Sequence, residues 1–175
     1  QQYVPASDDL IADTGASNVE DLLALMRKFK GSHEDFDYFV VPTVPDIKQQ
    51  KDTANTANEL AKMGVTANKI KVVLNRVEDG SSPGRQFAAL LGFLDENPVA
   101  SINLRAHLTD NEIYQRVKHD GRSISDLAAD NTDYKALISK AKGQTEKVEL
   151  ADKLAVKRLA HGVLPELDTC FDALA

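Results

Sequence analysis

The residues best suited to chemistry stand at the ends of two apolar runs. LIADTGAS contains Asp13, and IKVVLNR ends in Asn75 and Arg76. Ligands of open α/β sheets bind beside the carboxyl ends of the strands, so these side chains would face a binding crevice. A carboxylate there can hold a magnesium-bound water beside a phosphate. A carboxamide supplies both the donor and the acceptor needed to read a purine edge.

Asp13-Thr14-Gly15 permits two other interpretations. It is the signature of an aspartic protease half-site, in which two like-charged aspartates share a proton within a β-rich chain. Here a helix is predicted directly afterwards and no glycine-rich hairpin follows, which disfavours a protease. A plain turn between a strand and a helix is the third interpretation. Asn75 and Arg76 are likewise common where strands give way to loops.

Length and composition narrow the class of protein. The 175 residues suffice for one domain with a sizeable core. The net charge of −6 provides no general footprint for nucleic acid, although a local basic patch stays open. The single cysteine, Cys170, excludes an internal disulfide, and the four histidines have no metal-ligand spacing. No apolar run is long enough to span a membrane and no signal peptide is visible, so we expect a cytoplasmic protein.

Hydrophobic periodicity predicts short strands that alternate with helices. The strands are predicted at residues 10–13, 38–41, 70–75 and 99–104. The helices are predicted at residues 18–30 and 47–63, from Ser82-Pro83 to Pro98, at 112–118 and 132–142, and from Glu146 onward. This order is typical of an α/β fold with a mainly parallel sheet and helices on both faces.

Several residues are predicted to set the limits of these elements. Ser17, three residues before Glu20, predicts a capping box. Pro42 and Pro45 are predicted to end the second strand. Gly162 and Pro165 are predicted to break or kink the last helix.

Two parts are predicted along the chain, an α/β core over residues 1–142 and a C-terminal helical segment over residues 143–175. The boundary lies at Gly143-Gln144-Thr145. The C-terminal helix carries an apolar face that either packs on the core or faces a partner chain. Its residues are Val148, Ala151, Leu154, Ala155 and Leu159.

The order of these motifs resembles the ParA/MinD group of deviant P-loop ATPases and, within it, the StbB-type plasmid stability proteins. LIADTGAS, then YFVVPTVP after one helix, then KIKVVLNRV after the next, carry the resemblance. INLR and EIYQRVKHDGRSISDL extend it, and it covers roughly residues 8–141. It implies a P-loop NTPase-like fold with a helical C-terminal extension.

The resemblance also implies functions for the three site residues. Asp13 would hold magnesium through water and position the attacking water, Asn75 would contact adenine, and Arg76 would pack against the base. The family implies an ATP-dependent homodimer that works with a DNA-bound partner protein in plasmid partition or stability. Direct DNA binding stays open. The alternative is a non-catalytic module of the same fold that binds a protein partner through its C-terminal helices.

The phosphate loop that defines this family is missing. The glycine-rich stretches here, residues 79–84 and Gly143, contain no Gly-Lys-Ser/Thr. Because backbone N–H groups and the loop lysine normally cradle the phosphates, we expect this chain alone to be inactive and to bind neither ATP nor magnesium. The family's first strand lies inside the sheet. We therefore expect truncation of a larger protein, with exposed strand edges beside the gap.

Overall fold

The computed structural model describes residues 10–78 and 80–174. It is an α/β fold in which strands alternate with helices, as the sequence predicts. The elements are η1 (Ala16–Asn18), α1 (Val19–Lys28), η2 (Ser32–Asp35), β1 (Phe39–Thr43), α2 (Ile47–Lys62), η3 (Ala67–Lys69), β2 (Ile70–Val77), α3 (Pro83–Gln86), α4 (Ala88–Glu96), β3 (Ser101–Thr109), α5 (Ile113–Asp120), α6 (Ile124–Ala128), α7 (Tyr134–Lys140) and α8 (Gln144–Asp172).

The strands form a parallel sheet in the order β1-β2-β3. Phe39 pairs with Ile70 at the start of β1 and Thr43 with Leu74 at its end, so β1 and β2 run in regular register. Between β2 and β3 the register shifts, and Leu74 lies opposite His107. The central strand β2 is therefore buried between its neighbours, while β1 and β3 form the sheet edges.

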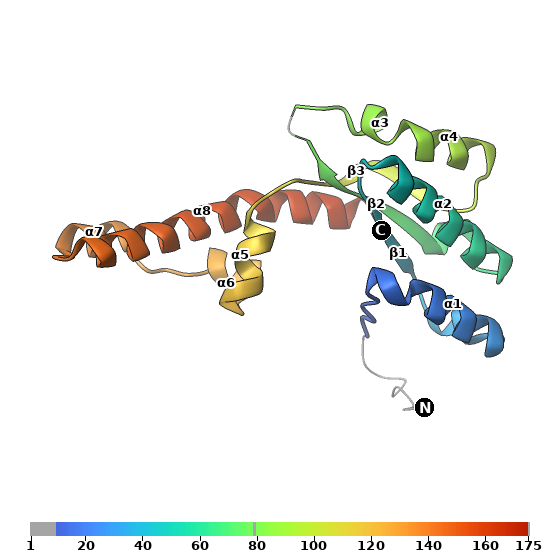
Figure 1. Ribbon diagram of the computed structural model, residues 1–175, viewed down its shortest axis with the longest axis horizontal. Helices are drawn as coiled ribbons and strands as arrows, with labels where there is room; N and C mark the ends of the chain where they lie inside the picture. The colour runs from blue at the N-terminus through green and yellow to red at the C-terminus, as the bar shows by residue number, and fades with distance from the viewer. Residues whose placement is uncertain (1–9, 79, 175) are drawn as a thin grey trace.

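One face of the sheet carries α1, α2 and α4 (Figure 1). Val72 and Leu74 of β2 pack against Leu90 and Leu94 of α4 and against Phe87, which directly precedes that helix. Nearer the amino end of β2, a second cluster joins α1 and α2 to the sheet through Leu23, Met26, Ala57, Leu60 and Ile70. The predicted helices on this face are confirmed, except that Phe87 divides the third of them into α3 and α4.

The opposite face is covered only in part. Cys170, near the end of α8, packs on Val73 and Ala106. Over β1 this face is open, and Val40 is 54% exposed. Away from the sheet, α8 continues as an arm along which α5, α6 and α7 lie (Figure 1). A cluster of its own holds the arm together: Ile113, Leu127, Ala128, Val156, Ala160 and Val163.

The strand predicted at residues 10–13 is wrong. These residues are irregular and exposed, with Leu10 at 62% and Ile11 at 94% exposure. A strand needs a hydrogen-bonded neighbour, and the sheet within the described residues ends at β1. The capping box is wrong too. Ser17 lies inside η1 and its hydroxyl donates to the Asn18 side chain at 3.3 Å.

The prolines and Gly162 are also placed differently from prediction. Pro42 lies within β1, which tolerates it because β1 is an edge strand whose outward-facing nitrogen needs no partner. Helix α8 continues through Gly162 and Pro165 to Asp172. Val163 and Cys170 are buried on either side of Pro165, and this packing outweighs the hydrogen bond that the proline removes.

One buried side chain, Gln50 of α2, links three segments on the covered face. It is 1% exposed. Its Nε2 donates to the carbonyl oxygens of Pro45 at 2.8 Å and of Gln86 at 3.0 Å. Its Oε1 accepts from the backbone N–H of Leu90 at 3.1 Å. The amide thereby fixes the β1–α2 turn, the end of α3 and the first turn of α4 relative to one another.

We predict that Gln50→Ala lowers the free energy of unfolding by about 3 kcal/mol, because it leaves buried backbone groups without partners and opens a cavity. The neighbouring Gln49→Ala is the matched control. Gln49 is exposed, and its replacement should cost less than about 0.5 kcal/mol. Urea denaturation followed by circular dichroism measures both. Equal losses in the two variants would contradict the linking function of Gln50.

Candidate functional site

The carboxyl end of the central strand holds the predicted pair Asn75 and Arg76. The Oδ1 of Asn75 accepts a hydrogen bond from the backbone N–H of Arg76 at 2.8 Å. Arg76 has a φ of 55°, a left-handed conformation that costs a residue with a side chain roughly 1–2 kcal/mol. The strand continues past Asn75 to Val77, because the register with β3 shifts here. Strain of this kind is concentrated at functional sites.

Other polar groups lie at the same edge of the sheet. Thr43 ends β1 and is 3% exposed, and its hydroxyl has no hydrogen-bond partner in the described part of the chain. Thr43 pairs in register with Leu74, the residue before Asn75. Because side chains alternate between the two faces along a strand, the side chains of Thr43 and Asn75 lie on opposite faces of the sheet. After β2, the backbone N–H of Glu78 donates to Gln86 Oε1 at 3.3 Å. The edge thus offers a hydroxyl, a carboxamide and an exposed guanidinium, but no paired nucleophile and base.

The position of Asp13, the predicted catalytic and magnesium-side carboxylate, differs from the prediction. It is exposed in the irregular segment before η1, not at the end of a strand. It makes no hydrogen bond or ion pair with Asn75 or Arg76. Asn75 and Arg76 are neighbours in the sequence, Asp13 shares no polar contact with them, and the functions of all three stay predictions.

A second polar centre joins the sheet to the arm. The carboxylate of Glu166 on α8 accepts from the backbone N–H of Thr109 and, at 2.8 Å, from its hydroxyl. Beside it the hydroxyl of Tyr114 is buried, with no partner among the described residues. Burial and the nearby Glu166 raise the pKa of Tyr114 to about 12. The same two causes raise the pKa of the Cys170 thiol. Sequence reasoning missed this centre because its parts lie far apart in the chain.

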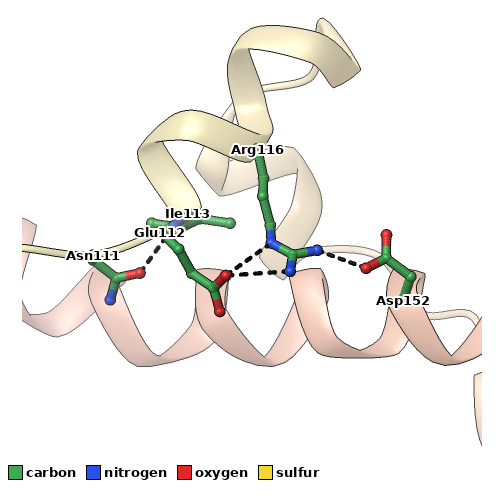
Figure 2. Close-up of polar contacts among 5 residues, drawn as sticks. All are labelled: Asn111, Glu112, Ile113, Arg116 and Asp152. Carbon is green, nitrogen blue, oxygen red and sulfur yellow. Dashed lines mark hydrogen bonds and ion pairs between the residues drawn. The ribbon is translucent and has the colours of Figure 1, made fainter.

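An ion-pair bridge holds α5 against α8 (Figure 2). The guanidinium of Arg116 lies 3.2 Å from Glu112 and 2.6 Å from Asp152. At the start of α5, Asn111 Oδ1 accepts from the backbone N–H of Ile113 at 3.0 Å. Hydrogen bonds to Asp152 and Glu112 raise the pKa of Arg116 further. The contact between Arg116 and Asp152 thus links α5 to α8.

A groove of about 520 Å³ runs between the β3–α5 connection and α8. Asp110 and Glu112 line one wall, and Arg158, Gly162 and Glu166 line the other. Its charged groups have both signs. No group of three or more His, Cys, Asp or Glu side chains that could hold a metal ion occurs within the described residues.

No helix in the described ranges is long and apolar enough to cross a lipid bilayer. Comparisons of the chain with protein-family models, with curated proteins and with solved structures find no match.

Two tyrosines provide a test of the centre beside Glu166. Tyr114→Phe should change the free energy of unfolding at pH 7 by less than about 0.5 kcal/mol, because no hydrogen bond is lost. Tyr134→Phe is the matched control. The Tyr134 hydroxyl donates to Asp130 at 2.5 Å, so its loss should cost about 2 kcal/mol.

The same variants differ at alkaline pH. The raised pKa means that folded Tyr114 keeps its proton while the unfolded chain loses it near pH 10. The stability from the neutral phenol is therefore complete below pH 10 and lost as the pH rises toward 12. Tyr114→Phe should flatten this decline, as measured by denaturation across that range. An unchanged decline would contradict the burial of this phenol.

Proposed function

We propose that this chain is the strand–helix core of a ParA/MinD-type ATPase of the StbB-like plasmid partition or stability class. One observation carries the proposal: the Asn75–Arg76 pair lies at the carboxyl end of the central parallel strand, with Arg76 held in a strained left-handed conformation. Backbone strain at the binding edge of a parallel sheet is expected where the chain must contact a ligand.

The side chains at this edge suit a nucleotide base. The Oδ1 of Asn75 retains a second lone pair beside its bond to the Arg76 N–H, and its amide N–H groups are free to donate. The exposed guanidinium of Arg76 can stack on an aromatic base. In the proposal Asn75 reads adenine, Arg76 packs against it, and Asp13 holds a magnesium-bound water near the phosphates.

The open edge of β1 supports the proposal that a further strand belongs to the sheet. Pro42 has no N–H and needs its nitrogen away from β2, which directs the N–H and carbonyl of Val40 to the free edge. A further parallel strand can pair there and cover the exposed Val40. We propose that a phosphate-loop strand occupies this edge in the active ATPase. That ATPase would use ATP and magnesium and act in the cytoplasm as a homodimer with a DNA-bound partner protein.

A second candidate function comes from the arm. A non-catalytic module of this fold would bind a protein partner through its C-terminal helices. The exposed face of α8, where Val148 is 58% exposed, favours this alternative. It requires neither a phosphate loop nor a functional Asn75.

Calorimetric titration with Mg-ATP separates the two candidates. The 175-residue chain should show negligible binding, because it has no glycine-rich N–H cradle and no loop lysine. A chain extended upstream to the first in-frame Met should bind ATP at about micromolar Kd and unfold at a higher temperature. Micromolar binding by the short chain, or none by the extended chain, would refute the proposed phosphate-loop strand.

Two substitutions in the extended chain test the site residues separately. Asp13→Ala should lower turnover by about 10²–10³-fold with ATP affinity nearly unchanged, because it removes a group that acts in the transition state. Asn75→Ala should weaken ATP by about 1–3 kcal/mol and reduce its preference over GTP. Steady-state ATPase assays and nucleotide titrations measure both. Turnover within a few-fold of the parent for Asp13→Ala, or an unchanged ATP preference for Asn75→Ala, rejects that residue's assignment.

A further inference from the structure

The helices on the covered face determine where a strand before α1 belongs. The strands β1, β2 and β3 follow one another across the sheet in sequence order, and α1, α2 and α4 all lie on one face (Figure 1). Crossovers between parallel strands are right-handed in almost all proteins, so helices on one face carry successive strands across the sheet in one direction. A strand directly before α1 therefore belongs at the free edge of β1.

The segment before α1 is apolar and has no place in the sheet. Leu10 and Ile11 are exposed, and residues 10–13 are irregular. Thr14 and Gly15 alone separate this segment from η1, so it stays tethered beside α1. A Cβ added to Gly15 would meet no atom within 4 Å, so the space around this connection is open. The segment is thus close to the edge of β1 and leaves apolar side chains in water, which burial would stabilise.

The edge of β1 offers this segment both backbone and side-chain partners. Val40 directs its N–H and carbonyl outward, as argued above, and its side chain is exposed. Thr43 provides a second, independent observation. Its hydroxyl is buried and has no hydrogen-bond partner among the described residues. A buried hydroxyl without an acceptor is unfavourable, so a conformation that supplies an acceptor is stabilised.

We propose that residues 10–13 dock on the free edge of β1 as a fourth parallel strand, with Asp13 beside Thr43. Leu10 then lies beside Val40. The Asp13 carboxylate accepts a hydrogen bond from the Thr43 hydroxyl, and the N–H and carbonyl of Val40 pair with the backbone of the segment. The structure shows the undocked segment together with the edge that receives it.

Side-chain alternation selects this register. In it Ile11 faces the covered side of the sheet, in line with Val41, which packs in the cluster beneath α1 and α2. A slip of one residue would turn Ile11 to the open face and carry Asp13 away from the Thr43 hydroxyl. A slip of two residues would place Asp13 beside Val41, where an unpaired carboxylate would lie against apolar side chains.

Docking closes the sheet edge of the 175-residue chain without nucleotide. An unpaired edge strand is a template for pairing with other chains, and a covered edge prevents this association. The phosphate-loop strand of the proposed function needs the same edge, so it must displace residues 10–13. The segment is thus a strap that competes with that strand, and the inference stands or falls separately from the ATPase function.

Amide hydrogen exchange of the 175-residue chain, measured by NMR, tests the docking. The Val40 amide should exchange at least about tenfold more slowly in the parent than in Ile11→Glu, because the glutamate would have to enter the apolar cluster beneath α1. Ala12→Glu is the matched control. Ala12 is also exposed and would face the open side of the sheet, so this variant should retain slow exchange. The Val72 amide in β2 should exchange equally in all three chains.

Three outcomes overturn the proposal. Equal exchange of Val40 in the parent and in Ile11→Glu, if fast, means that the edge stays open. If exchange is slow in both, another occupant such as a second copy of the chain covers the edge. Fast exchange in Ala12→Glu as well as in Ile11→Glu contradicts the register.

A second measurement tests the contact between Asp13 and Thr43. Thr43→Val removes the hydroxyl and should not lower the free energy of unfolding of the sheet, since the hydroxyl has no partner in the undocked state. It should nevertheless speed the exchange of Val40 by about threefold or more, because docking loses a hydrogen bond. In an Asp13→Ala background the same substitution should add no further change. An undiminished effect in that background, or no effect in the parent, rejects the contact.

Discussion

The side-chain amide of Gln50 is the constraint on which the carboxyl edge of the sheet depends. It satisfies the carbonyl before α2, the last carbonyl of α3 and an N–H in the first turn of α4. Gln86 continues the link, because its side chain accepts from the N–H of Glu78, two residues beyond Arg76. A buried amide in the helical layer is thereby linked through Gln86 to Glu78, the residue that follows the central strand. Both N–H groups and the oxygen of the Gln50 amide have partners, which favours one arrangement of the helices around it.

That anchoring gives a physical reason for the strain at Arg76 to persist. A left-handed residue with a side chain relaxes unless its surroundings hold it. Two residues before Arg76 lies the buried Leu74, which pairs with Thr43, and directly after Arg76 lies the buried Val77, whose carbonyl accepts from the backbone N–H of Asp110. The strained residue is thus fixed between two packed ones, and its own side chain is left exposed.

The arm is attached differently from the helices that cover the sheet. It contacts the sheet where the Glu166 carboxylate accepts hydrogen bonds from Thr109 and where Cys170 packs on Val73. The rest of α8 is held by α5, α6 and α7, so the arm has a cluster of its own, separate from those between the sheet and α1, α2 and α4 (Figure 1). Within the described residues, the edge of β1 has no strand beside it. The proposed function assigns a further strand to that edge.

The sequence by itself determined the features that follow from hydrophobic periodicity. The apolar spacing predicted α1, the buried β2 and the parallel α/β class, and the structure has all three. It also placed Asn75 and Arg76 near a strand end. Sequence patterns gave wrong predictions where the secondary structure of a residue depends on neighbours that are distant in the chain. LIAD reads as a strand but has no strand beside it, and Pro165 reads as a helix break but is carried through by packing on both sides.

Only the tertiary structure decided the joint between Thr109, Tyr114 and Glu166, the Gln50 network and the φ of Arg76. None has a local signal, because each arises from contacts between segments that lie far apart in the sequence. Local patterns determine which face of an element is apolar. Which faces are covered, and which stay open, depends on how the elements are arranged in space.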